Sequence, residues 1–558
     1  MTELKKNDSV RLFIEDFTKE GEGIGHVDGY TLFVKDAVIG DEVMALVTKA
    51  KKNYAFAKMT EILVPSPDRV KPRCANARRC GGCRFQEYSY EKQLEWKRAH
   101  VKDVMVRIGG FPDLEVRPVI GMEDPWRYRN KAQYPVGVVK KPDGSYETAA
   151  GFYAGRTHFL IETDDCVLTH EINGQIVRRF VDFLKRYDIS PYDEQNHTGL
   201  VRHLLIREGF ATGEILVCPV INGDRLPHAD ELISLLREVP GVKSICLNVN
   251  KEKGNVILGE QILPLYGNPW IEDVLLGNRF RISPRSFYQV NPVQTEKLYT
   301  EALRAADLKG TEVVYDLYCG IGTISLCMAS RAREVYGVEI VPDAVRDAKE
   351  NALRNGIGNV HFYTGAAEDL VVRGEFEPGV PCPKADVVVL DPPRKGCDAS
   401  LIDAVLKMAP DRIVYVSCDP ATLARDLKLF AEGRDGVAFK PVYAQPTDLF
   451  GHTVHVETVC LLSKLSEVKN HISVKVDMNE MDLTAAESKA TYQEIKEWVK
   501  EKYGFQVSHL NIAKTKRKCG IIERQNYNLP KSEDSRSPET PKEKEEAIIA
   551  AFKAFRMI

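Results

Sequence analysis

A cysteine at the junction of a predicted strand and a predicted helix is the residue best placed for chemistry in this chain. Residues 412–417 are β-branched and aromatic, which predicts a buried strand that leads directly to Cys418. Asp419 suits the N-cap of the following helix, and Pro420 suits its first position. The free N–H groups and the dipole at a helix start should favour a nucleophilic thiolate. The alternative is a buried thiol that serves only as a small hydrophobic side chain.

A second group of cysteines has the spacing of a metal site. Cys74, Cys80 and Cys83 follow the pattern C-x5-C-x2-C, with two glycines between the last two. Cys166 is the best candidate for a fourth ligand. Four thiolates suit structural zinc or an iron–sulfur cluster, and the spacing does not choose between them. Three unrelated thiols are the alternative, although a cytosolic chain seldom places cysteines so close together without a ligand.

The region around Cys418 has the element order of a nucleotide-binding sheet. Strand and helix patterns alternate over residues 278–465, which predicts a Rossmann-like, parallel, doubly wound α/β sheet. Its first strand runs into a glycine turn at Gly320. Glu339 ends the second strand about 20 positions later, where an acid can bind ribose hydroxyls. Ser325 stands where a dinucleotide site needs its third glycine, so the pattern favours S-adenosylmethionine over NAD.

Two further acidic residues lie at the ends of predicted strands in this sheet. Asp391 follows the strand at residues 385–390 and precedes two prolines that would hold it over the ligand crevice. Glu457 belongs to an alternating pattern in the last strand, which places it on one face. A surface salt bridge is the alternative role for Glu457.

The segments before this sheet have other patterns. Residues 1–67 contain short strands and glycine turns, which predict a small closed, OB-like barrel. Its basic and aromatic side chains suit a single-stranded nucleic acid, or else a solvated edge strand: Lys49, Lys51, Lys52, Lys58, Tyr54 and Phe56. Residues 68–277 have the pattern of an α+β domain. Within it, the cations and aromatics of residues 126–131 could clamp RNA or form an ordinary exposed strand.

Residues 466–558 predict a small, mainly helical extension. A capping box at residues 484–487 should start one helix, and Ser508 should start a second, basic helix, as in a helix-turn-helix. Residues 528–544 have the composition of a linker, and a last helix follows. The extension is interpreted as an RNA-docking module or as a small packing domain with a solvated basic face.

Length and composition agree with a multidomain, cytoplasmic protein. The chain has 558 residues, of which 44% are hydrophobic, and a net charge of −3, so nucleic acid would have to bind local patches. No apolar run approaches the roughly 20 residues of a membrane span, and no secretory segment opens the chain. The 13 cysteines are an odd number, which favours a reducing compartment.

Five motifs occur in the order typical of one family. They are SPRSFYQVN at residues 283–291, DLYCGIG at 316–322, DPPR at 391–394, SCDP at 417–420 and HVE at 455–457. Together they resemble the RNA uracil-5-methyltransferase family, and the resemblance covers about residues 5–465. Residues 1–67 resemble the TRAM barrel that accompanies its ribosomal members.

This resemblance implies a function and a site. The substrate would be 23S ribosomal RNA, and S-adenosylmethionine would lie against Gln289, Tyr318, Glu339 and Asp391. Cys418 would be the nucleophile that adds to carbon 6 of uracil, and Glu457 the base that removes the proton from carbon 5. A 4Fe–4S cluster would be held by Cys74, Cys80, Cys83 and Cys166, with zinc as the alternative. The protein is expected to be a monomer without an obligate protein partner.

Three other functions fit the sequence less well. A transfer-RNA uracil-5-methyltransferase typically lacks both the barrel and the cysteine group. A radical S-adenosylmethionine enzyme uses C-x3-C-x2-C, which differs from the spacing of Cys74, Cys80 and Cys83. A non-catalytic RNA-binding protein with a structural metal would not need Cys418 and Glu457 in these motifs.

Overall fold

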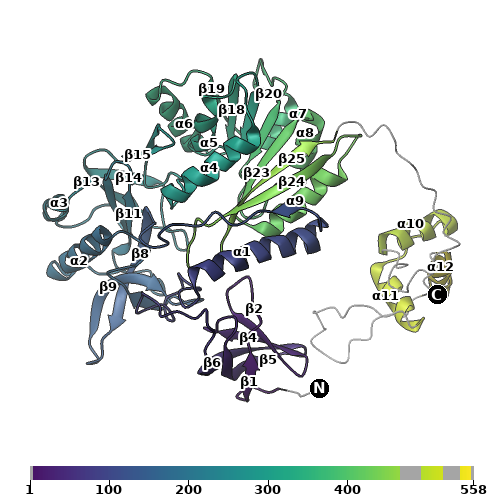
Figure 1. Ribbon diagram of the computed structural model, residues 1–558, viewed down its shortest axis with the longest axis horizontal. Helices are drawn as coiled ribbons and strands as arrows, with labels where there is room; N and C mark the ends of the chain where they lie inside the picture. The colour runs from purple at the N-terminus through teal and green to yellow at the C-terminus, as the bar shows by residue number, and fades with distance from the viewer. Residues whose placement is uncertain (1–3, 466–491, 520–540, 555–558) are drawn as a thin grey trace. The chain divides into compact units, whose positions relative to one another are not determined.

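The computed structural model of the protein describes residues 4–465, 492–519 and 541–554. The chain divides into two compact units, Met1–Val468 and Lys469–Ile558. The larger unit contains a barrel-like sheet, a mixed central sheet and a large α/β sheet (Figure 1). None of the helices in the described ranges is both long enough and apolar enough to pass through a lipid bilayer.

The N-terminal sheet curls around a small core. Its six strands run in the order β1-β5-β6-β4-β3-β2, and alternate residues of β5 point inward. The core contains Leu32, Val34 and Val43, all without exposed surface. The strands are β1 (Ser9–Phe13), β2 (Asp16–Phe17), β3 (Gly23–Val27), β4 (Tyr30–Lys35), β5 (Glu42–Ala50) and β6 (Tyr54–Val64).

The central sheet has seven strands and carries two helices. The strand order is β10-β9-β8-β11-β12-β13-β14, antiparallel except between β12 and β13. The strands are β8 (Lys131–Lys140), β9 (Tyr146–Tyr153), β10 (Leu160–Glu162), β11 (Val201–Glu208), β12 (Ile215–Ile221), β13 (Val242–Val249) and β14 (Gln261–Tyr266). The helices α2 (Glu171–Arg186) and α3 (Ala229–Arg237) pack on one core with the sheet.

The largest sheet is doubly wound, as the alternation of strands and helices predicts. Its order is β19-β18-β17-β22-β23-β25-β24-β7, and the first five strands are parallel. The strands are β17 (Val313–Leu317), β18 (Glu334–Glu339), β19 (Val360–Thr364), β22 (Val387–Leu390), β23 (Arg412–Ser417), β24 (Phe439–Thr447), β25 (Glu457–Lys464) and β7 (Glu115–Val116). The strand order reverses between β17 and β22, the place where open α/β sheets bind ligands.

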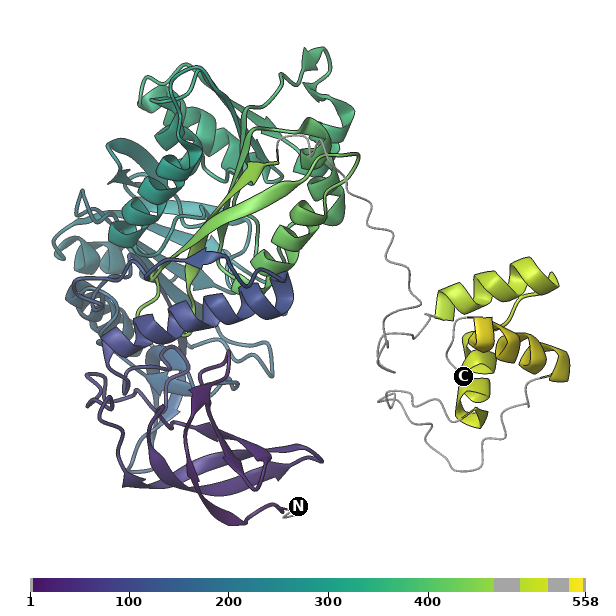
Figure 2. The same ribbon diagram turned by 45° about the vertical axis from the view of Figure 1, so that its right-hand side comes forward.

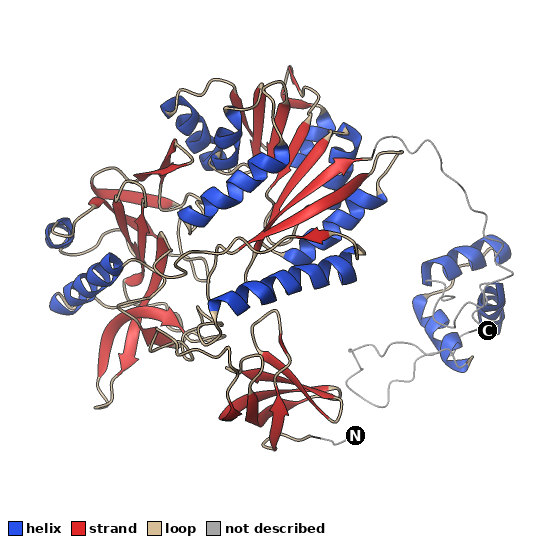
Figure 3. Ribbon diagram, in the orientation of Figure 1, coloured by secondary structure: helices blue, strands red, loops and turns tan. Residues whose placement is uncertain are grey.

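Helices cover both faces of this sheet (Figure 3). The helices α4 (Pro292–Ala306), α5 (Thr323–Ala329) and α6 (Pro342–Arg354) share one core with it. The second core is shared with α1 (Tyr90–Val104), the π-helical turn η1 (Met105–Gly109), α7 (Ala367–Arg373), α8 (Ala399–Met408) and α9 (Pro420–Glu432). Two short hairpins complete the unit: β15 (Ile271–Leu275) with β16 (Asn278–Ile282), and β20 (Glu375–Glu377) with β21 (Val380–Pro381).

Helix α1 connects the barrel region to the large sheet. In two views it runs between the N-terminal barrel and the sheet edge at β24 (Figures 1 and 2). The segment after it forms β7, which pairs in parallel with β24. Helix α1 lies before the central sheet in sequence, but it and the strand after it pack at the β24 edge of the large sheet.

The smaller unit contains α10 (Tyr492–Tyr503), α11 (His509–Lys518) and α12 (Lys542–Ala554). They enclose a core that includes Ile495, Ile512 and Phe552. The Ser508 hydroxyl accepts a hydrogen bond from Asn511 N, as expected of a cap at the start of α11. The predicted capping box at 484–487 and most of the predicted linker at 528–544 lie outside the described residues.

Candidate active site

All six residues predicted to handle substrate or cofactor line one cavity of about 700 Å³. The cavity lies at the carboxyl ends of β17, β18, β22 and β23, next to the reversal in strand order. The six are Gln289, Tyr318, Glu339, Asp391, Cys418 and Glu457. Residues from the loop before α4 and from the start of β25 therefore meet those of the parallel strands.

Cys418 lies between β23 and α9, as its sequence context predicts. Asp419 caps the helix: its Oδ1 accepts hydrogen bonds from Ala421 N at 2.9 Å and Thr422 N at 3.0 Å. The predicted preference for a thiolate is nevertheless wrong for the free protein. Burial and the carboxylates of Glu457 and Asp391 raise the pKa of Cys418 to about 11. Burial outweighs the helix start because a poorly solvated cavity disfavours the charged thiolate, and the two carboxyls disfavour it further once they ionise.

Glu457 is the first residue of β25 and is only 3% exposed. Burial, together with the nearby Asp391, raises the pKa of Glu457 to about 8. Asp391 is also affected, because burial and Asp316 raise its pKa to about 7. A carboxyl with a pKa near neutrality can accept a proton and release it again, which is what a general base requires.

The glycine turn after β17 also lines the cavity. Gly320 and Gly322 have positive φ angles of 56° and 83°, and Tyr318 has a φ of 76°. The Glu339 carboxylate is held by this turn, because Gly320 N donates to it at 3.2 Å and Val341 N at 2.9 Å. Glu339 is therefore oriented at the cavity wall by backbone groups from both sides.

Asp316 is a cavity residue that the sequence analysis did not select. It is 1% exposed, and burial raises its pKa to about 6. One carboxylate oxygen accepts a hydrogen bond from Ser325, the residue that replaces the third dinucleotide glycine. The other oxygen has no hydrogen-bond partner among the described residues, although it is buried beside the cavity. Its place as an acid next to the glycine turn was the available signal.

The four cysteines of the predicted metal site line a second cavity, of about 330 Å³. Asn76 N donates to the sulfur of Cys74 at 3.4 Å, and Gly82 N donates to that of Cys80 at the same distance. Burial raises the pKa of Cys83 to about 12 and also raises that of Cys166. Within the described ranges, no three Cys, His, Asp or Glu side chains are grouped so that they could hold a metal ion.

Comparison with known proteins identifies the family. The family model tRNA (Uracil-5-)-methyltransferase matches residues 275–465, and the TRAM domain model matches residues 4–60. An uncharacterized RNA methyltransferase of Clostridium tetani is 46% identical over 467 residues, which are 84% of this chain and 98% of that protein. One of Halalkalibacterium halodurans is 47% identical over 468 residues, with the same coverage. This chain belongs to the RNA uracil-5-methyltransferase family.

A solved member of this family shares most of the architecture. The structure of Pyrococcus abyssi tRNA (uracil-54, C5)-methyltransferase in complex with S-adenosyl-L-homocysteine is 27% identical, with a TM-score of 0.65. It covers 81% of this chain and 99% of its own. The structural likeness therefore extends far beyond the predicted methyltransferase domain at residues 278–465. The contrast drawn from sequence between ribosomal and transfer-RNA enzymes therefore loses weight.

The TRAM domain of this methyltransferase presents the predicted basic and aromatic face. Tyr54, Phe56 and Phe33 form a ring cluster on β4 and β6, with centroids 5.6 to 5.7 Å apart. The four lysines of the predicted platform are exposed: Lys49, Lys51, Lys52 and Lys58. Cations around partly exposed rings are the usual surface for single-stranded nucleic acid.

The segment at 126–131 has an internal role instead of the predicted RNA clamp. Trp126 stacks on His452 with the ring centroids 3.8 Å apart, and the Arg73 guanidinium lies 4.7 Å from the Trp126 ring. Tyr128 is 4% exposed, and its hydroxyl donates to Gly451 O at 3.1 Å. These side chains stabilise the turn that precedes Glu457.

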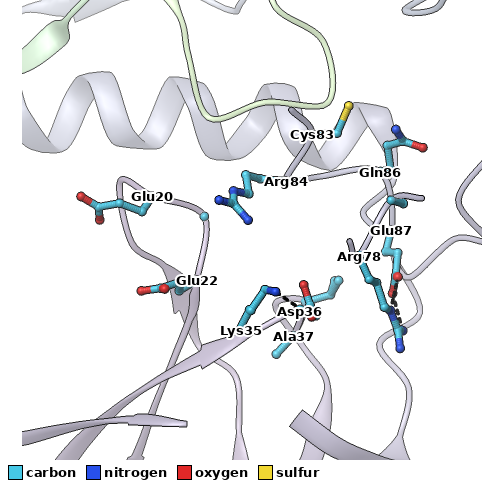
Figure 4. A pocket seen from close by; sticks show the side chains of 13 residues that line it. Glu20, Glu22, Lys35, Asp36, Ala37, Arg78, Cys83, Arg84, Gln86 and Glu87 are labelled. Atoms are coloured by element: carbon cyan, nitrogen blue, oxygen red, sulfur yellow. Dashed lines mark hydrogen bonds and ion pairs between the residues drawn. The ribbon is translucent and has the colours of Figure 1, made fainter. Parts of the chain in front are cut away.

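The loop that carries Cys74, Cys80 and Cys83 is here named the cysteine loop. It meets the TRAM domain across a small charged pocket (Figure 4). Arg78 forms an ion pair with Glu87 on the loop side, at 2.5 Å. On the barrel side, Lys35 lies 3.9 Å from Asp36. Each of these ion pairs joins two residues on the same side of the pocket, so their charges are already balanced. We therefore interpret the pocket as a contact between domains and not as a ligand site.

Proposed function

We propose that this protein methylates carbon 5 of a uridine in 23S ribosomal RNA, with S-adenosylmethionine as the methyl donor. The observation that carries the proposal is that Cys418 and Glu457 line the same cavity. The glycine turn, Asp316 and Glu339 form the rest of a nucleotide-type wall. The proposed nucleophile, the proposed base and the residues proposed to bind the cofactor thus line the same cavity.

The chemistry follows from the weak nucleophilicity of carbon 5 of uracil. The Cys418 thiol first loses its proton to solvent, and addition of the thiolate to carbon 6 moves the electrons of the double bond into an enolate, so that carbon 5 becomes electron-rich. S-Adenosylmethionine, when bound, supplies an electrophilic methyl group on its sulfonium sulfur. Carbon 5 takes this methyl group as the carbon–sulfur bond breaks, which leaves S-adenosylhomocysteine. Glu457 then takes the proton from carbon 5, and loss of the Cys418 thiolate restores the double bond. The target uridine must first leave its base stack to reach the cavity.

We also propose a 4Fe–4S cluster on Cys74, Cys80, Cys83 and Cys166. The four residues line one cavity of about 330 Å³, as the ligands of a shared cluster would. Lys131 lines this cavity and lies directly opposite Arg207 in the β8–β11 pair. Like charges opposite each other destabilise a strand pair, and an anionic thiolate cluster beside them would offset this cost.

Two further parts of the proposal concern RNA and compartment. The exposed lysines and rings of the TRAM domain are assigned to the single-stranded part of the substrate. The 13 cysteines are all free thiols, which suits the reducing cytoplasm.

Transfer RNA is the second candidate substrate, because the similar enzyme of Pyrococcus abyssi acts on it by name. The deciding experiment offers unmodified 23S ribosomal RNA and unmodified transfer RNA, separately, to the purified protein with labelled methyl donor. Mapping of the modified nucleotide should find 5-methyluridine in the ribosomal RNA. Label in transfer RNA alone would replace the substrate, and no label in either would refute the function.

A further inference from the structure

The turn that carries Arg394 is attached to helix α9 by a buried carboxylate. Asp426 lies on α9 and has no exposed surface. Its Oδ2 accepts hydrogen bonds from Cys397 N at 2.8 Å and from the Tyr415 hydroxyl at 2.6 Å. Its Oδ1 accepts one from Arg425 Nε at 2.8 Å. One side chain thus joins the helix, strand β23 and the end of the turn.

The turn also rests on the neighbouring arginine. Arg425 Nη2 donates to Lys395 O at 2.9 Å and to Cys397 O at 3.4 Å. Gly396 has a φ of 78°, and a side chain there would lie 2.5 Å from both Arg425 Nη2 and Asp426 Oδ2. Because the backbone of the turn lies directly on the Arg425–Asp426 pair, displacement of that pair would displace the turn.

The turn presents Arg394 to the active-site cavity, which Cys418 and Glu457 also line. Arg394 opposes the two carboxylates there, since its charge lowers the pKa of Cys418 while Glu457 and Asp391 raise it. His455 and Lys395 also line this cavity, and burial lowers the pKa of His455. Arg394 is the cation whose charge lowers the pKa of the Cys418 thiol and so favours its thiolate.

We propose that Asp426 is a positioning residue that holds Arg394 beside Cys418 and so keeps the thiol reactive. Helix α9 then serves the site twice. Its N-cap, Asp419, orders the backbone after Cys418, and Asp426, two turns later, fixes the cation that faces the thiol. The meaning of this reactivity for methylation rests on the proposed function, but the reactivity itself can be measured without RNA.

The test is the alkylation rate of Cys418 by iodoacetamide in the full-length protein, from pH 7 to pH 10, read by peptide mass spectrometry. The thiol proton goes to solvent in this assay. In Asp426→Asn the side chain keeps its shape but loses the charge that binds Arg425. We expect the rate at pH 8 to fall about tenfold, the effect of a one-unit rise in thiol pKa. Arg394→Met should give the same loss, and the double variant no further loss.

Two variants control for structure. Asp403→Asn removes a carboxylate of helix α8 that pairs with Arg434 at 2.8 Å, and it should leave the rate unchanged. Tyr415→Phe deletes one hydrogen bond to Asp426 and should slow alkylation less than Asp426→Asn; it takes the place of that variant if Asp426→Asn does not fold. The proposal is overturned if folded Asp426→Asn and Tyr415→Phe both show the pH profile of the wild type. It is also overturned if Arg394→Met shows that profile. If the wild-type protein methylates no RNA but these variants still slow alkylation, the proposed function fails and the positioning role stands.

Discussion

The acidic groups of the active-site cavity influence one another at close quarters. Burial raises the pKa of Cys418 to about 11, that of Glu457 to about 8 and that of Asp391 to about 7. The Cys418 thiol and most of the Glu457 carboxyl are therefore protonated in the free protein at neutral pH. The thiolate of Cys418 is favoured by positive charge nearby, such as that of Arg394.

The first prediction concerns the pH dependence of adduct breakdown. Glu457 must be ionised to accept the proton, and its raised pKa means that only about a tenth is ionised at pH 7 and about nine tenths at pH 9. The breakdown rate of a preformed RNA–protein adduct should therefore rise about tenfold over this range. Rapid-quench gels at several pH values measure it. A rate that does not change from pH 6 to pH 9 would contradict the assignment.

The second prediction separates nucleophile from base by mutation. Glu457→Gln should accumulate a covalent RNA–protein species, because the adduct forms but its carbon 5 proton is not removed. Cys418→Ala should form no adduct and should still bind S-adenosylmethionine with nearly unchanged affinity. A denaturing gel with labelled RNA detects the shifted band. Full turnover by either variant would remove the corresponding role.

Sequence alone could predict local structure at Cys418 but not its chemistry. The strand, the Asp419 cap and the proline are encoded within ten residues, so the strand–helix junction was predictable. The raised pKa was not, because its causes, Glu457 and Asp391, are distant in sequence. Asp316 was missed for a similar reason: its unpaired oxygen is apparent only once the cavity is formed.

At the scale of elements, helix α1 secures the turn that leads to the base. Lys97 Nζ lies 2.6 Å from Asp448 Oδ1, and neither side chain has exposed surface. Tyr90 donates to the other oxygen of Asp448 at 2.8 Å, and the Gln93 side chain accepts from His452 N at 3.0 Å. These partners are more than 350 residues apart in sequence. Because the partners are so far apart in sequence, the sequence gives no indication of this contact.

The third prediction follows from this buried ion pair. Lys97→Met should lower the free energy of unfolding by about 3–5 kcal/mol, because it leaves the Asp448 carboxylate buried without its cation. Lys92→Met is the matched control on the same helix, since Lys92 forms an exposed pair with Glu95 and its loss should leave the free energy of unfolding nearly unchanged. Urea denaturation compares the two. Equal, small losses would mean that the buried pair adds nothing to stability.

At the scale of the larger unit, the cysteine loop links the TRAM domain to the catalytic sheet. Arg84 N and Phe85 N both donate to His452 O, at 2.9 and 3.0 Å. His452 has a φ of 63° and lies five positions before Glu457. The loop that would hold the proposed cluster is thus hydrogen-bonded to the turn that precedes Glu457, the proposed base.

The fourth prediction tests this link. Cys83→Ser should loosen the loop and speed amide exchange in residues 448–457, because the hydrogen bonds to His452 O follow directly after Cys83. Hydrogen exchange read by mass spectrometry measures this without RNA. Cys246→Ser, at a buried thiol of the central sheet, is the control and should leave that segment unchanged. Equal exchange in the wild type and Cys83→Ser would show that the loop does not support the base.

The last prediction concerns the extension after Leu465. The relatives from Clostridium tetani and Halalkalibacterium halodurans align over 98% of their own length with 84% of this chain, and the extension has its own core. A protein truncated after Leu465 should therefore keep its methylation rate within about twofold.

If the extension docks RNA, truncation should weaken RNA binding and reduce the salt dependence of that binding. Lys516 is 6% exposed and Lys518 pairs with Glu545 at 2.8 Å, so part of the basic helix already serves internal packing. Filter binding of RNA at two salt concentrations distinguishes the two interpretations. An unchanged affinity after truncation would mean that the extension is a small packing domain with a solvated basic face.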